Sequence, residues 1–205
     1  MEVAFFVPPT IGPQEELFKG MAGRRTDLYQ NMLAHLTEFM QYIDQHGYYG
    51  VGFTEHHMNI EGLTCSNNTT MLDLYFGMQT ENIRLGALGY VLPVHDPFRV
   101  AAEVAMLDQM TKGRAIAGFA RGVQTRWVNT MGQHRGLADN VTDPAAYNEL
   151  KKELFAEHLE IILKAWKNDT FSHKGKYWEI PPKSINWLGT KSTREMGAGL
   201  DENDQ

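Results

Sequence analysis

Short apolar runs alternate with amphipathic helical patterns along most of this sequence, and no other feature limits its possible folds as strongly. The apolar runs cover residues 3–7, 50–54, 83–92 and 115–120. Helical patterns with apolar residues on one face cover residues 27–46, 68–81, 96–112 and 143–167. The last two helices have clear starts, because Asp96-Pro97 and Asp143-Pro144 each place an N-cap residue before a proline suited to the first helical position. Repeated strand–helix units predict parallel strands joined by crossover helices, and hence an α/β fold.

The number of strands predicts an incomplete barrel. A closed TIM-type (β/α)8 barrel needs about 250 residues, whereas this sequence has 205 residues and shows strand patterns in the four runs above. Residues 171–180, around Lys174-Gly175, predict a small β-hairpin. Residues from about 183 to 205 are expected to form a polar tail without another strand. We therefore expect residues 1–205 to form a single domain, with only the first four or so βα units of the barrel plus the hairpin.

Composition and charge exclude several classes of function. The net charge of −6, with scattered Lys and Arg, argues against a nucleic-acid or anionic-membrane surface, which would need clustered basic residues. The single cysteine, Cys65, excludes an internal disulfide framework and indicates a reducing compartment. The first residues lack a signal-peptide pattern, and no stretch approaches the roughly 18 apolar residues of a membrane span. We therefore expect a cytoplasmic protein that binds neither nucleic acid nor membrane.

Three consecutive strand ends carry residues that suit ligand binding. They are Glu55-His56-His57, Leu88-Gly89-Tyr90 and Arg121-Gly122. The carboxyl ends of parallel strands share one rim, where ligands of βα folds bind. Because side chains alternate along a strand, only one histidine of the pair should face the rim.

Each of these residues has a functional and a structural interpretation. The histidine that faces the rim could act as a base near neutral pH, or it could simply close the strand. Gly89 allows a flat ring to approach, but it could also mark a bend. Arg121 suits bidentate phosphate binding, although a structural ion pair is an equal alternative. Together they predict a flat, phosphorylated cofactor.

Other kinds of catalysis find less support in the residue patterns. The adjacent histidines are not the His-x-His of metal-dependent barrel hydrolases, and neither His-Glu-x-x-His nor paired cysteines occur, so we expect no metal site. Cys65 has no clear catalytic partner, and a Gly-x-Ser-x-Gly motif is missing. Walker and Gly-x-Gly-x-x-Gly loops are missing as well.

Three segments resemble the N-terminal portion of the luciferase-like monooxygenase family, the flavin-dependent monooxygenases of the bacterial luciferase type. They are GFTEHHMNIEG (52–62), LGALGYVLPVHDPFRVAAEVAMLDQMTKGR (85–114) and AGFARG (117–122). The middle segment is long and specific, and the resemblance extends over residues 1 to about 180. It implies the fold of a TIM-type barrel.

The resemblance also implies roles for individual residues. His56 matches the catalytic histidine beside the flavin ring, and Glu55 matches the acidic residue that supports it. Leu88-Gly89 matches a non-proline cis peptide that packs against the flavin. Arg121, within Ala120-Arg121-Gly122, matches the arginine that binds the flavin phosphate. Ala120 stands where bacterial luciferase has a reactive cysteine, which argues for a substrate other than its aldehyde.

The implied reaction uses reduced FMN and O2 to oxygenate a small organic substrate, with a separate flavin reductase supplying the reduced FMN. An F420-dependent oxidoreductase of the same superfamily and a truncated flavin-binding protein without turnover remain alternatives. Gln124, Arg126 and Trp127 either shape the pocket or are ordinary loop residues. Because a half-barrel leaves strand edges and an apolar face uncovered, we expect a homodimer formed through the early helices, as in the family, or an aggregating chain.

Overall fold

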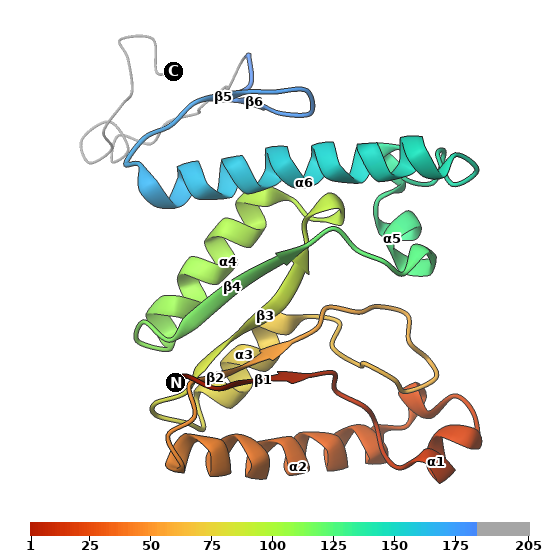
Figure 1. Ribbon diagram of the computed structural model, residues 1–205, viewed down its shortest axis with the longest axis vertical. Helices are drawn as coiled ribbons and strands as arrows, with labels where there is room; N and C mark the ends of the chain where they lie inside the picture. The colour runs from red at the N-terminus through yellow and green to blue at the C-terminus, as the bar shows by residue number, and fades with distance from the viewer. Residues whose placement is uncertain (184–205) are drawn as a thin grey trace, which may run out of the picture.

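The computed structural model describes residues 1–183, in which a parallel sheet of order β1-β2-β3-β4 is flanked by helices (Figure 1). The strands of this sheet are β1 (Ala4–Val7), β2 (Gly50–Phe53), β3 (Arg84–Val91) and β4 (Ala115–Ala120). The helices are α1 (Gln14–Phe18), α2 (Thr26–Gln45), α3 (Thr69–Gly77), α4 (Pro97–Met110), α5 (Thr125–Met131) and α6 (Pro144–Lys167), with short 3-10 turns at Ala22–Arg24, Leu92–Val94 and Gln133–Arg135. The antiparallel strands β5 (His173–Lys174) and β6 (Glu179–Ile180) form the predicted hairpin. The tail predicted beyond residue 183 lies outside the described residues.

The observed order of strands and crossover helices confirms the predicted α/β fold, a partial TIM-type barrel. All strand pairs of the larger sheet are parallel. Both Asp-Pro helix starts are confirmed as well. The Asp96 carboxylate accepts hydrogen bonds from the Phe98 and Arg99 amides, and the Asp143 carboxylate accepts from Ala145 and Ala146. Such caps satisfy amides that the first turn leaves without a helical partner.

The helices cover one face of the sheet and bury its apolar side chains. Val51 and Phe53 of β2 pack with Phe76 of α3 in one core cluster, and Ala87 of β3 packs with α4 and α6 in another. Because side chains alternate along a strand, Gly52, between Val51 and Phe53, belongs to the opposite face of β2. The region between the helices and the sheet therefore forms the core, and the opposite face carries Gly52 together with the exposed side chains of Phe6 and Leu88.

Two parts of the chain differ from the sequence prediction. The helix expected to reach residue 81 ends at Gly77, because the Asp44 carboxylate of α2 binds the amides of Glu81, Asn82 and Ile83 and turns the chain into β3. The short helices α1 and α5 were not predicted. Trp127, for which the sequence left a pocket role and an ordinary loop position open, lies in α5 and is buried. Local patterns missed these features because a distant carboxylate and tertiary packing create them.

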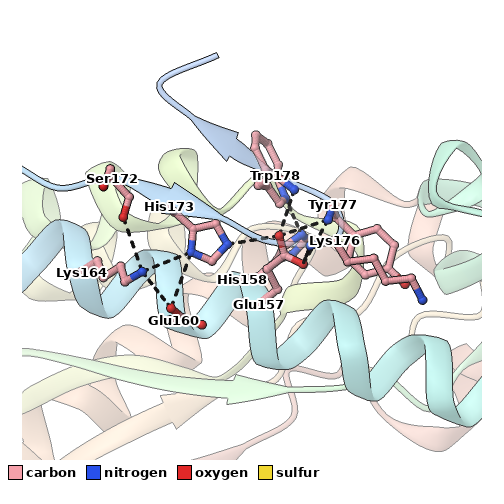
Figure 2. A network of polar contacts seen from close by, with 9 residues as sticks. All are labelled: Glu157, His158, Glu160, Lys164, Ser172, His173, Lys176, Tyr177 and Trp178. Atoms are coloured by element: carbon pink, nitrogen blue, oxygen red, sulfur yellow. Dashed lines mark hydrogen bonds and ion pairs between the residues drawn. The ribbon is translucent and has the colours of Figure 1, made fainter. Parts of the chain in front are cut away.

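The hairpin is attached to α6 through one buried carboxylate (Figure 2). Glu157 of α6 accepts hydrogen bonds from three successive backbone amides, those of Lys176, Tyr177 and Trp178, at 2.9–3.1 Å. His173 of β5 approaches the same carboxylate at 3.2 Å. A side chain on α6 thus determines where the hairpin lies.

None of the helices among residues 1–183 combines the length and the apolar character that a membrane crossing requires.

Candidate functional site

A pocket of about 400 Å³ opens at the carboxyl ends of β2, β3 and β4. Its volume falls within the roughly 300–1,000 Å³ typical of small-molecule sites. All of the site residues expected from the sequence line this rim pocket: Glu55, His56, Leu88, Gly89, Ala120, Arg121 and Gly122. The structure therefore brings the three strand ends together, as the parallel order predicted.

Glu55 is a buried ionised carboxylate that accepts three hydrogen bonds from the protein. Its Oε1 atom accepts hydrogen bonds from His57 Nε2 at 2.8 Å and His95 Nε2 at 2.6 Å, and Oε2 accepts from the Val91 amide at 2.7 Å. Burial alone raises the pKa of Glu55, but the hydrogen bonds from both histidines and from Val91 outweigh it and lower the pKa to about 2. The Glu55 carboxylate therefore organises the rim.

The two adjacent histidines have different environments. His56 lines the rim pocket, whereas His57 is bound to Glu55 and packs against Trp127 at a ring distance of 4.8 Å. The expectation that one histidine faces the rim is confirmed. His56 Nδ1 lies 2.7 Å from Thr64 Oγ1 and 3.3 Å from Gln124 Nε2. Burial lowers the pKa of His56; Glu55 opposes this effect and His57 adds to it.

Leu88 offers an apolar surface at the pocket, next to a cis peptide bond. The Leu88–Gly89 bond is cis, as the resemblance implied. The Leu88 side chain lies over the neighbouring strand, since a Cβ added to Gly52 would be 2.3 Å from Leu88 Cδ1. Only glycine therefore fits at position 52 without a movement of Leu88. With 43% of Leu88 exposed, a flat apolar ligand can pack on it.

Positive charge gathers at the end of the pocket formed by β4 and α6. Arg121 is exposed and has no ion-pair partner among residues 1–183. Lys151 of α6 is buried at 9% exposure and donates to the Gly122 carbonyl at 3.0 Å. Burial lowers the pKa of Lys151, and the charge of Arg121 lowers it further. A bound anion would relieve this repulsion.

Gly122 follows Arg121 in a conformation that places the backbone against the pocket wall. Its φ is +78°, and an added Cβ would lie 2.7 Å from Val91 Cγ1. Glycine adopts this left-handed region without the steric cost that other residues incur.

Several pocket residues were not identified from the sequence. Lys151 lines the pocket, and its signal was a lysine within the buried stripe of α6 beside Tyr147 and Leu154. His95, which lies outside the pocket lining, reaches Glu55 and supports the site from behind. No sequence spacing indicated that contact.

Of the three residues left open, Gln124 and Trp127 line the pocket. Arg126 instead pairs with Glu61 at 2.7 Å and with Asn59 on the exposed surface.

A partial βα barrel with its pocket at the carboxyl ends of the strands has the architecture of the TIM-type barrel proteins, which bind their ligands at this rim. The family model described as luciferase-like monooxygenase matches residues 1–194. The chain belongs to this family.

Relatives and solved structures agree with this assignment. The alkanal monooxygenase beta chain of Photorhabdus luminescens is 26% identical over 161 residues, covering 78% of this chain and 45% of the relative. The oxygenase component of flavin-dependent trigonelline monooxygenase from Acinetobacter baylyi is 28% identical over 155 residues, covering 75% of this chain and 38% of the relative. The oxygenating constituent of 3,6-diketocamphane monooxygenase from Pseudomonas putida, solved with FMN, superposes with a TM-score of 0.66 at 23% identity, covering 87% of this chain and 42% of that one.

This chain spans less than half the length of these relatives. The structural likeness establishes the fold of a luciferase-like TIM-type barrel.

Proposed function

We propose that residues 1–205 form a single domain that carries the flavin site of an FMN-dependent monooxygenase. The enzyme would use reduced FMN and O2 to oxygenate a small organic substrate, as a cytoplasmic homodimer supplied by a separate flavin reductase. The observation that carries this proposal is the rim pocket itself, in which His56, Leu88 and the cations Arg121 and Lys151 line one cavity. The named relatives support it: one is an oxygenase component of a flavin-dependent monooxygenase, and one was solved with FMN.

The residues present fit a flavin mononucleotide. Arg121 and Lys151 would hold the phosphate, because unpaired cations at a pocket end favour a dianion. Leu88 and Gly89 would pack against the flat ring system. Bound reduced FMN would supply the electrons that activate O2, since this chemistry belongs to the cofactor.

The remaining pocket residues would contribute to the reaction by orienting the cofactor and shaping the pocket. His56 would contact the ring system. Ala120 and Gly122 would keep the pocket wall thin, because their side chains are small or absent. Glu55 would act as a positioning residue, because its oxygens are occupied by His57, His95 and Val91. Apolar neighbours would exclude water from the ring.

Anaerobic titration of the protein with reduced FMN, reduced riboflavin and reduced F420, followed by quenching of tryptophan fluorescence, tests the cofactor. We expect FMN to bind most tightly, because riboflavin lacks the phosphate. Lys151→Met should weaken FMN binding about 10- to 100-fold, the equivalent of one charge-assisted hydrogen bond of roughly 1.5–3 kcal/mol, and should leave riboflavin binding unchanged.

Lys152→Met is the matched control, because Lys152 is exposed on the same helix and pairs with Glu149. Equal affinity for FMN and riboflavin would contradict a phosphate site, and tighter binding of F420 would favour the deazaflavin-dependent alternative. Oxygen uptake with reduced FMN and organic substrates separates a monooxygenase from a flavin-binding protein without turnover. Light scattering tests the dimer.

A further inference from the structure

Gln124 connects a buried tryptophan to His56. Trp127 Nε1 donates a hydrogen bond to Gln124 Oε1 at 3.0 Å, and Gln124 Nε2 lies 3.3 Å from His56 Nδ1. Trp127 is 1% exposed, so its indole is held by the surrounding core. Through Gln124, the fixed position of the buried indole restricts the orientation of a histidine at the pocket.

The direction of these hydrogen bonds follows from the chemistry of the groups. The indole N–H only donates, so the Gln124 atom that faces Trp127 is the amide oxygen. The atom that faces His56 is then the amide NH2, which also only donates. The neighbouring Thr64 hydroxyl accepts from Asn59 and lies 2.7 Å from both the Leu63 carbonyl and His56 Nδ1, so its single proton must point to His56 when Nδ1 is an acceptor. Gln124 therefore requires His56 Nδ1 to be the acceptor.

We propose that Gln124, held by Trp127, is a positioning residue that fixes His56 as the Nε2–H tautomer. His56 then offers its Nε2–H group as a hydrogen-bond donor to the pocket, whereas the sequence suggested that it could act as a base. The lone pair that could take up a proton lies on Nδ1, which faces Thr64 and Gln124. Nε2 has no hydrogen-bond partner in the part of the chain that the structure describes, so its N–H is available to a ligand.

Two further observations agree with this tautomer. Burial lowers the pKa of His56, which favours the neutral ring in which a tautomer is defined. The carboxylate next in sequence, Glu55, is occupied by His57, His95 and the Val91 amide, so the His56 ring makes its contacts elsewhere. The significance for an oxygen-activating flavin rests on the proposed function, whereas the tautomer itself belongs to the protein alone.

Nuclear magnetic resonance of the ligand-free, 15N-labelled chain tests the proposal. Long-range proton–nitrogen spectra distinguish a protonated ring nitrogen from an unprotonated one by its chemical shift, and His56→Gln identifies the resonances. We expect an unprotonated Nδ1 and a protonated Nε2 in the wild type. Gln124→Glu keeps the shape but offers an acceptor, so the proton should move to Nδ1. Trp127→Phe frees the amide and should give a mixture.

Thr64→Ala is the control, because it removes the other side-chain contact of Nδ1 and, if Gln124 sets the tautomer, should leave Nε2 protonated. Unchanged resonances of His95 would show that a variant is folded. A wild-type spectrum with the proton on Nδ1, or a Gln124→Glu spectrum identical to wild type, would overturn the proposal. If Gln124→Glu does not fold, the wild-type and Trp127→Phe spectra decide the matter. Flavin titration is separate: the Nε2–H tautomer without flavin binding would refute the proposed function alone.

Discussion

Replacing Glu157 with glutamine should release the β5–β6 hairpin from α6. The buried carboxylate accepts from the amides of Lys176, Tyr177 and Trp178 and is approached by His173 (Figure 2). Glutamine has the same shape but only one acceptor oxygen, and its NH2 group would face a backbone N–H. The loss of one charge-assisted hydrogen bond costs roughly 1.5–3 kcal/mol, and a buried donor left without a partner costs about 1–3 kcal/mol. Together these costs predict local destabilisation of about 2.5–6 kcal/mol.

Native-state hydrogen exchange measures this local opening directly. Exchange of the amides at residues 176–178 should accelerate by about 60- to 20,000-fold in Glu157→Gln, since about 1.4 kcal/mol corresponds to a factor of ten. Amides of the β2–β3 pairing should be unaffected. The control is Glu149→Gln on the same helix, whose carboxylate is 60% exposed and pairs with Lys152; exposed pairs contribute roughly 0–1 kcal/mol. Equal protection of residues 176–178 in both variants would refute this reasoning.

Two further predictions concern buried carboxyl groups with opposite pKa shifts. The Asp73 carboxyl group is buried and has no hydrogen-bond partner among residues 1–183, and its burial raises its pKa well above the ordinary value. The protonated form therefore stabilises the fold below the unfolded-state pKa, and this stabilisation is lost as the pH rises through the folded-state pKa. Asp73→Asn should therefore resist urea better than wild type in mildly alkaline buffer and equally well in acid; no gain in alkaline buffer would refute this. The pKa of Glu55 is lowered from 4.5 to about 2, so its contribution is present above 4.5 and lost as the pH falls toward 2. Glu55→Gln should be less stable at neutral pH and show a smaller loss across that interval in the same titration, and an undiminished acid transition would count against it.

The site residues on the strands could be predicted because they depend on local order. Glu55 and Arg121 each follow an apolar run, Leu88 lies in the second half of one, and adjacent parallel strands bring such positions to one rim. The N-caps Asp96 and Asp143 depend only on the next few residues and were equally predictable.

Contacts between distant residues could not be predicted in this way. His95 reaches Glu55 across 40 positions, and the amide of Asn82 reaches Asp44 across 38. Lys151 faces Gly122 only because α6 packs against the 3-10 turn that follows β3. Neither the spacing of apolar residues nor the capping residues indicate how a helix is rotated against its neighbours.

The sequence by itself determined the parallel order of the strands, the positions where they end and the residues placed on the rim, because side-chain period and capping act over a few residues. Only the tertiary structure decided which polar groups meet there. The charge at the pocket end, the state of Glu55 and the orientation of Gln124 toward His56 depend on packing between elements far apart in the chain, and burial then sets how strongly those groups interact.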